Sequence, residues 1–369
     1  MRKILTGIVT ISLSVSLFLS LPANVMGAGV IQMNTAVERL SGLDRYETAT
    51  RIADELAEQH GISFSTGGKF ENVVLASGNN YPDALAGAPL ANQEDAPILL
   101  LDSTPEASSK TLEYIKAHVK LSGEVYLLGG TGVIPLSFTE ALKDAGFAPE
   151  KIHQLGGQNR NETSLIIAEK VSNPLNEVVL VSDSNFYDAL TIASAATSDA
   201  GPILLVSDSG LTTEQKAFCD RQKTVVALGE IVKNIGSIYS RALGVAGANR
   251  YDSNALWSIQ LKNKPFIFLA TGEDYPDALA GAVLAGSLGS APIYLTKPNE
   301  LPLEIEAALN IASYYNKQAQ TLTNEHGQTV SIPPVVYPKL YVLGGQGAVY
   351  TEIVNKAEEI LNGPGFSLK

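Results

Sequence analysis

The chain has 369 residues, one cysteine and a formal net charge of −12. Its length is enough for two or three ordinary domains, and a single cysteine excludes a disulfide within the chain. Because phosphate backbones are bound by clustered lysine and arginine, the acidic balance excludes nucleic acid as an expected partner. An acidic protein can still bind an anion where basic groups converge locally.

The first 28 residues have the pattern of a secretory signal peptide. Two basic residues open the chain, an apolar stretch runs from Ile4 to Leu21, and the small residues Gly27 and Ala28 follow. This layout is typical of signal peptides. Its serines make it less apolar than the run of about 20 residues that a membrane anchor needs. We therefore expect cleavage after residue 27 or 28, export, and no membrane association of the mature chain.

Four short motifs recur three times in the same order along the rest of the chain. The first is Gly-x-Asp/Asn-Arg, at residues 42–45, 157–160 and 247–250. The second has an aspartate followed by Ala-Leu, at 80–85, 185–190 and 274–279. The third begins with Pro-Ile, at 97–100, 202–205 and 292–295, and the fourth begins with Leu-Gly, at 128–130, 228–230 and 343–345. Such periodicity predicts three divergent copies of one structural unit.

We place copy one at residues 36–149, copy two at 150–240 and copy three at 241–363. An insertion at about residues 313–338 of copy three is polar and then proline-rich, so we expect a surface excursion there. Residues 29–36 and those after Gly363 are expected to be loose ends.

Each copy is predicted to alternate strands and helices. In copy one, strands are expected at 72–76, 97–101 and 125–128, and helices at 83–92, 104–118 and 135–144. Continuous apolar runs such as 97–101 are typical of strands buried on both faces of a parallel sheet. This alternation favours right-handed crossovers and an α/β fold with a mostly parallel sheet flanked by helices.

The first motif has the spacing of a helix start. An N-capping side chain is followed three residues later by an acid, in the pairs Asp44 and Glu47, Asn159 and Glu162, and Asn249 and Asp252. An arginine then occupies each first helical position: Arg45, Arg160 and Arg250. A cation there opposes the helix dipole at a cost of about 0.3–1 kcal/mol. Its compensating partner could be an internal carboxylate, such as the repeated aspartate of the same or the next copy, or an anionic ligand held bidentately.

The second motif places an aspartate three residues after an Asn or Asp. The repeated aspartates are Asp83, Asp188 and Asp277. This spacing before an apolar run is again typical of a helix cap. A structural role and a ligand contact both remain open for these carboxylates.

Together the motifs resemble the cell wall binding repeat 2 family of exported Gram-positive proteins. The resemblance rests on Gly-x-Asp/Asn-Arg-Tyr, Tyr-Pro-Asp-Ala-Leu-Ala, Pro-Ile-Leu-Leu and Leu-Gly-Gly, and it spans about Glu38 to Gly363. It implies three tandem Toprim-like units packed with pseudo-threefold symmetry. It also implies secretion and non-covalent attachment to an anionic wall polymer, teichoic-acid-like or a secondary wall polysaccharide. The candidate polymer contacts are then Arg45, Arg160, Arg250, Asp83, Asp188 and Asp277.

Copy two departs most from the family pattern. Asn161 stands where the other copies have Tyr46 and Tyr251, and Tyr187 stands where they have proline. The three copies therefore need not bind the polymer equally.

An enzyme acting on the wall, such as an amidase, is the alternative function, and a surface-layer component is a third. The four histidines, at 60, 118, 153 and 326, fall at different points of the copies and form no His-Glu-x-x-His spacing. Asp183 and Asp208 are isolated, unlike the metal-binding Asp-x-Asp pair of Toprim enzymes. Cys219 occurs in one copy only and is expected to be a small core residue. We therefore expect no catalytic residue, metal or cofactor.

Overall fold

The computed structural model describes residues 34–365, except 81–82, 195–200, 319, 324–328 and 333–336. All of these belong to one compact unit, residues 33–369. The predicted signal peptide, residues 1–28, and His326 lie outside the described residues. None of the described helices combines the length and the apolar character needed to cross a membrane.

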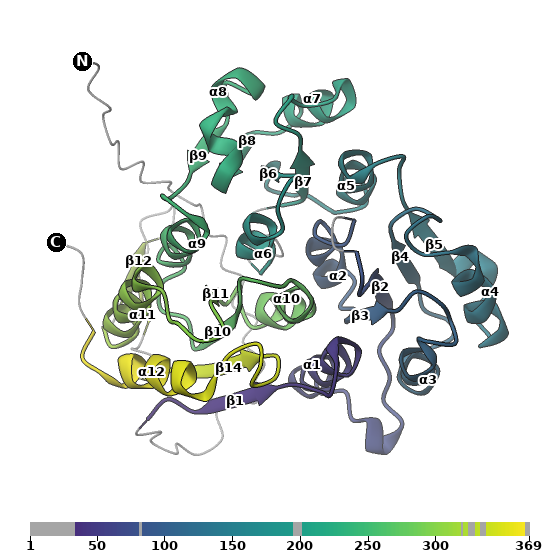
Figure 1. Cartoon of the computed structure of the whole chain (residues 1–369), viewed down its shortest axis with the longest axis horizontal. Coiled ribbons are helices and arrows are strands. Elements are labelled where there is room, and N and C mark those ends of the chain that lie inside the picture. Colours follow the sequence, from purple (N-terminus) through teal and green to yellow (C-terminus); the bar gives the residue numbers. More distant parts are fainter. Residues whose placement is uncertain are drawn as a thin grey trace. The chain divides into compact units, whose positions relative to one another are not determined.

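Three parallel sheets of four strands each form the framework (Figure 1). The first sheet contains, in spatial order, β3 (Ile98–Leu101), β2 (Val73–Ser77), β4 (Val125–Leu128) and β5 (Ile152–Leu155). The second contains β7 (Ile203–Val206), β6 (Glu177–Ser182), β8 (Thr224–Leu228) and β9 (Leu243–Val245). The third contains β11 (Ile293–Thr296), β10 (Phe266–Thr271), β14 (Lys339–Leu343) and β1 (Val37–Leu40). The predicted α/β class and its three units are confirmed.

The fourth strand of each sheet is the segment that leads into the next copy of the first motif. Strands β5 and β9 lie just beyond the predicted copy boundaries and complete the preceding sheet. The third sheet is completed by β1, which lies at the start of copy one and pairs with β14 from Val37 opposite Leu340 to Leu40 opposite Leu343. Copy three is thereby joined to copy one, so the three copies follow one another in a closed cycle.

In the part of the chain that the structure describes, twelve α-helices accompany the strands, four to a copy. Helices α1 (Arg45–Gln59), α5 (Arg160–Ala168) and α9 (Arg250–Ser258) open the copies. Next come α2 (Ala88–Gln93), α6 (Tyr187–Ala193) and α10 (Pro276–Ser287), and then α3 (Ser109–His118), α7 (Thr213–Asp220) and α11 (Leu303–Asn316). The last are α4 (Leu136–Asp144), α8 (Ile235–Ile238) and α12 (Thr351–Asn362), and 3₁₀ turns form at Phe64–Thr66, Pro149–Lys151 and Gly229–Lys233.

The predicted strands of copy one match β2, β3 and β4 to within a residue or two. Helix α2 begins at Ala88 instead of residue 83, because residues 83–86 form a turn. The corresponding helices of copies two and three start at Tyr187 and Pro276. Helix α3 likewise begins at Ser109, five residues after its predicted start.

The copies pack on one another through the helices that follow the first central strands. Helix α10 contacts α1, α2 and α6, and α6 contacts α9; Figure 1 shows α2, α6 and α10 toward the middle of the three sheets. Glycines also let α2 and α10 approach the sheets of their own copies: a Cβ at Gly87 or Gly281 would come 2.2 Å from a methyl of Leu128 or Leu343. Burial of these Ala- and Gly-rich helices joins the three sheets through one continuous core.

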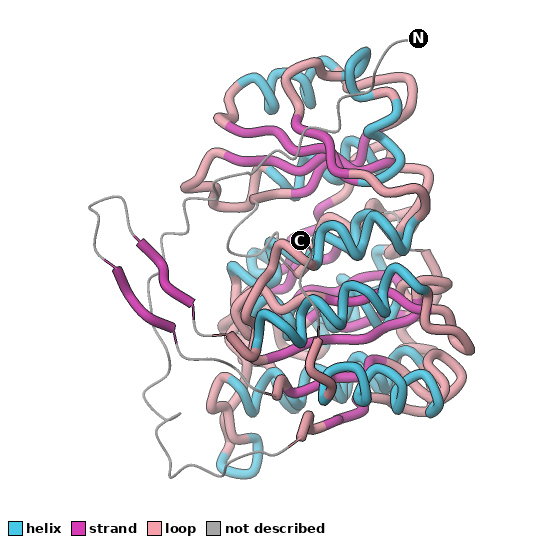
Figure 2. The backbone as a smooth tube through the Cα atoms, turned by 90° about the vertical axis from the view of Figure 1, so that its left-hand side faces the viewer, coloured by secondary structure: helices cyan, strands magenta, loops and turns pink. Residues whose placement is uncertain are grey.

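The insertion of copy three contains an antiparallel hairpin, β12 (Gln320–Thr323) with β13 (Thr329–Ile332). Figure 2 shows these strands outside the three parallel sheets. Helix α11 extends to Asn316, and Ser313 and Asn316 are buried. Ser313 and Asn316 therefore belong to the core, and the excursion begins later than the predicted residue 313. Thr35, predicted to lie in a loose end, is also buried and donates its N–H to Asn362 Oδ1 at 2.7 Å.

Candidate functional site

The first motif begins α1, α5 and α9, as predicted. The N-caps Asp44, Asn159 and Asn249 accept hydrogen bonds from the N–H of Glu47, Glu162 and Asp252 at 2.8, 3.0 and 3.0 Å. The three acids bond to the N–H of Leu43, Gln158 and Ala248, one residue before the N-cap. This differs by one residue from the expected capping box. The N-terminus of each of these helices is therefore capped by side chains of its own motif.

The glycine of this motif is required by the close approach of the capping acid. A Cβ at Gly42, Gly157 or Gly247 would lie 2.4–2.6 Å from side-chain carbons of that acid. The same three glycine N–H groups each donate at 3.0 Å to a hydroxyl six residues on, in Thr48, Thr163 and Ser253.

The arginine at each first helical position donates to a backbone carbonyl just beyond the first central strand of its own copy. The bonds run from Nη1 of Arg45 to Gly78 O at 2.5 Å, from Arg160 to Asp183 O at 2.6 Å, and from Arg250 to Gly272 O at 2.9 Å. A carbonyl partner compensates in part for a cation at the positive end of the helix. The arginines therefore lie at the carboxyl ends of the strands, where ligands bind in open α/β sheets.

Each arginine also lies within electrostatic range of the repeated aspartate of the preceding copy in the cycle. Arg160 acts on Asp83, Arg250 on Asp188 and Arg45 on Asp277, lowering the pKa of each carboxyl against the effect of burial. We call these the 1–2, 2–3 and 3–1 junctions. Arg45 additionally forms an ion pair with Asp274, with 3.3 Å between Nη2 and Oδ2. The six predicted residues thus form three pairs, each shared by two copies, and the aspartate comes from the preceding copy instead of the same or the next copy as expected.

Burial is the largest influence on the pKa values of the three aspartates. Asp83 and Asp188 are 9% and 1% exposed, and Asp277 is half-buried. Burial raises the pKa of Asp188 and of Asp277 to about 6, and it raises that of Asp83 above the ordinary value. A hydrogen bond with Thr163 opposes the shift at Asp83.

The fourth motif forms the turn against which each aspartate packs. Gly129, Gly229 and Gly344 have φ of +122°, +74° and +93°. A Cβ at these positions would come 3.0, 1.9 and 2.1 Å from a carboxylate oxygen of the aspartate in the same copy. In copy two, Asp188 Oδ2 accepts the N–H of Glu230 at 3.0 Å. The aspartate and the glycine are therefore one structural unit, and both positive φ and lack of space exclude a side chain.

The capping geometry predicted for the second motif is found only in part. Asn185 accepts the N–H of Asp188 at 3.2 Å, but α6 is capped at Phe186 without a side-chain hydrogen bond. In copy three, Asp274 accepts the N–H of Tyr275 instead. The aspartates contact the turn of the fourth motif, which the spacing alone could not indicate.

The three junctions differ in what surrounds the arginine. At the 2–3 junction the guanidinium of Arg250 lies 4.3 Å from the ring centre of Tyr187, and Glu230 accepts from Asn185 Nδ2 at 3.2 Å. At the 3–1 junction Arg45 is 5.9 Å from the ring centre of Tyr275. Cation–π contacts of this kind favour a fixed guanidinium.

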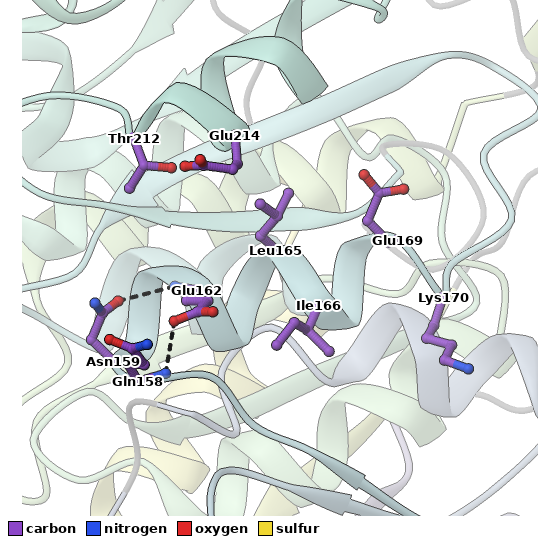
Figure 3. Close-up of a pocket in the computed structure, with 9 residues that line it drawn as sticks. All are labelled: Gln158, Asn159, Glu162, Leu165, Ile166, Glu169, Lys170, Thr212 and Glu214. Atoms are coloured by element: carbon purple, nitrogen blue, oxygen red, sulfur yellow. Dashed lines mark hydrogen bonds between the residues drawn. The ribbon is translucent and has the colours of Figure 1, made fainter.

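A groove of 610 Å³ lies on copy two, beside the start of α5 (Figure 3). It is lined by Gln158, Asn159, Glu162, Leu165, Ile166, Glu169, Lys170, Thr212 and Glu214. Three carboxylates and one ammonium group line its walls, so an anionic chain would be repelled there. Arg160 is not among the lining residues, and the groove is separate from the junctions.

The remaining reactive side chains are dispersed. Cys219 is buried in α7, and burial raises the pKa of its thiol to about 12, which keeps it protonated. His153 bonds to Glu124 at 2.6 Å, and His118 packs on Phe64 with ring centres 4.1 Å apart. Within the part of the chain that the structure describes, no three His, Cys, Asp or Glu side chains gather as a metal site.

Residues 39–139, 154–233 and 245–354 match the family described as cell wall binding domain 2 (CWB2). The chain belongs to this family. The prediction of a cell wall binding repeat family is confirmed, and binding to cell wall components is the property that the family name gives.

Two relatives from Bacillus subtilis (strain 168) share this region. The chain is 25% identical over 259 residues to N-acetylmuramoyl-L-alanine amidase LytC, covering 68% of this chain and 49% of the amidase. It is 28% identical over 277 residues to an amidase enhancer, covering 73% of this chain and 36% of that protein. The chain thus spans half or less of the length of these relatives.

Two solved structures from Clostridium difficile have the same fold. Cwp8 is similar with a TM-score of 0.70 and 24% identity, over 89% of this chain and 52% of that one. Cwp6 gives a TM-score of 0.68 and 22% identity, over 90% and 49%. At these identities the likeness shows the fold alone.

Proposed function

We propose that the chain is an exported, non-catalytic anchor that attaches non-covalently to an anionic polymer of the Gram-positive cell wall. Family membership supports attachment to the wall. The observation that carries the choice of an anionic ligand is the partly exposed arginine at every junction between copies. Each guanidinium has five N–H donors, and in each copy Nη1 is the one that bonds the strand-end carbonyl. The remaining donors suit a phosphate or carboxylate group.

Three similar sites would act together on a repeating polymer. Each additional junction that engages the same chain binds at a high effective concentration, so avidity exceeds the affinity of a single site. Weak individual sites are then sufficient, which fits junctions whose arginines already have internal partners.

The test is co-sedimentation of the mature chain with purified Gram-positive walls, before and after the anionic polymer is stripped. We expect binding that is lost on stripping. The variant R45Q/R160Q/R250Q should bind at least about tenfold more weakly, since a hydrogen bond to a charged group contributes about 1.5–3 kcal/mol. A matched control, R51Q/R221Q, removes two exposed arginines outside the junctions and should bind normally. Equal binding to stripped walls would contradict the proposal.

A second candidate function is participation in wall hydrolysis, because the relatives are named an amidase and an amidase enhancer. It is separated from anchoring by measuring release of wall fragments by the purified chain alone and with an added amidase. We expect no release by the chain alone. Turnover that survives the loss of wall binding would identify an enzyme.

A further inference from the structure

Carboxylates equal or outnumber the arginine at every junction. At the 2–3 junction Arg250 is accompanied by Asp188 and Glu230. At the 3–1 junction Arg45 is accompanied by Asp277 and Asp274. With all of these groups ionised, both junctions carry a net negative charge. An incoming phosphate or carboxylate would therefore meet no attraction there beyond directed hydrogen bonds.

The 1–2 junction shows the same arrangement with fewer acids. Arg160 acts on Asp83 across the junction, and the Thr163 hydroxyl bonds to the same carboxyl. Its charge is balanced when Asp83 is ionised and positive when Asp83 is protonated. At all three junctions, then, protonation of the repeated aspartate makes the net charge one unit more positive, from balanced to positive at the 1–2 junction and from negative to balanced at the other two.

We propose that binding of the anionic polymer at these junctions is coupled to protonation of Asp83, Asp188 and Asp277, so that the chain holds the wall more tightly under mildly acidic conditions than at neutral pH. This inference rests on the proposed function. It adds that protonation of these aspartates regulates polymer binding at the same site.

The geometry provides a place for the proton. Asp188 accepts its two side-chain hydrogen bonds, from Asn185 Nδ2 at 3.1 Å and from the N–H of Glu230 at 3.0 Å, at Oδ2. Oδ1 can therefore carry the proton without loss of either bond. The charged groups that act on Asp188 are Glu230 and Arg250, and those that act on Asp277 are Asp274 and Arg45.

The pH range follows from burial. Burial raises the pKa of Asp188 and of Asp277 to about 6, so both carboxyls gain protons between pH 7 and 5. A bound anion would raise these pKa values further, because it repels the carboxylate form. By linkage, each proton taken up on binding changes the association constant by about tenfold per pH unit.

The experiment measures binding to purified Gram-positive walls that retain their anionic polymer, at pH 7.5, 6.5 and 5.5 and constant ionic strength. We expect affinity of the unsubstituted chain to rise severalfold as pH falls. D188N/D277N should bind at pH 7.5 as tightly as the unsubstituted chain does at pH 5.5, with little pH dependence. The control D144N removes an exposed carboxylate on α4 and should keep the original dependence.

Calorimetry of the unsubstituted chain supplies a measurement that needs no variant. Titration with wall polymer in buffers of different ionisation enthalpy, at pH 6.5, should show net proton uptake. Affinity that is flat or falls on acidification, or binding without proton uptake, overturns the inference and leaves the proposed anchor intact. Absence of binding at every pH overturns the anchor itself.

Discussion

Copies two and three begin with the same backbone geometry but differ in the side chain after the arginine. In copy three the ring of Tyr251 lies over Gly272, where an added Cβ would come 3.0 Å from the ring. In copy two Asn161 takes the place of the tyrosine, and Asp183 takes the place of the glycine. Asn161 Nδ2 donates to Leu205 O at 2.9 Å. The residue after the arginine and the residue at the strand end therefore differ together between the two copies. Copy two packs this part of the unit with other side chains on the same backbone.

The largest loss of stability is expected at the first glycine of the fourth motif, which all three copies share. Gly344→Ala places a methyl group against Asp277 at a residue with φ of +93°. Backbone strain and overpacking should together lower the free energy of unfolding by about 2–5 kcal/mol. The measurement is denaturant unfolding followed by circular dichroism.

The matched control for that substitution is the next residue, where the copies have Gly130, Glu230 and Gly345. Nothing lies within 4 Å of a Cβ at Gly345, so Gly345→Ala should change stability by less than about 0.5 kcal/mol. Equal effects of the two substitutions would show that the packing of aspartate on glycine does not constrain the turn.

The pH dependence of stability tests whether burial raises the pKa of the repeated aspartate equally in copies two and three. The folded-state pKa of Asp188 is raised to about 6, so its contribution to stability is full below the unfolded-state pKa and is lost as pH rises through 6. Relative to Asp188→Asn, the original chain should lose about 3 kcal/mol of unfolding free energy between pH 4 and 7. Asp277→Asn should give the same trend. If the difference in unfolding free energy between the original chain and each variant did not change with pH, the raised pKa values of these aspartates would be contradicted.

The pairing of a tyrosine with a glycine can be broken in copy one, where a Cβ at Gly78 would come 2.6 Å from the ring of Tyr46. Gly78→Ala should cost about 1–3 kcal/mol through overpacking. Tyr46→Asn, which copies the residue of copy two, should recover most of that loss in the double variant. Thermal unfolding of the four proteins measures the coupling, and additive effects would show that the two positions changed independently.

The smallest effect is expected at the helix caps, which all copies form. Asn249 Oδ1 accepts two helix N–H groups, from Tyr251 at 2.9 Å and from Asp252 at 3.0 Å. Asn249→Ala should cost about 0.5–2 kcal/mol. Leu43→Ala, beside the cap of α1 and 91% exposed, is the control and should be near neutral.

Most of the fold could be predicted from the sequence because its signals are local. Apolar runs marked the central strands, and the spacing of Asp44, Asn159 and Asn249 marked three helix starts. The edge strands β1, β5 and β9 were missed because they are not continuous apolar runs: their sequences are VERL, IHQL and LGV. Their signal was the apolar residue two positions before each motif glycine, in Leu40, Leu155 and Val245.

The pairing of residues across copies could not be predicted, since it depends on which copy lies beside which. The sequence suggested an internal carboxylate as one partner for each arginine, but the cyclic order of the copies is set by tertiary contacts: β1 with β14, α10 with α1 and α6 with α9. The contact between Asp188 and Gly229 likewise joins positions separated by two strands and a helix. Neither kind of contact leaves a periodic pattern in the sequence from which it could be predicted.

The closure of the third sheet by β1 brings the two ends of the folded unit together. Arg39 of β1 donates to the carbonyls of Gly344 and Gly345 at 2.8 and 3.0 Å, and Thr35 is bonded to Asn362. A short linker from the end of α12 to Thr35 would therefore suffice for circular permutation, with new termini opened in the segment between α4 and β5. Any domain fused at either end would leave the molecule from the same place.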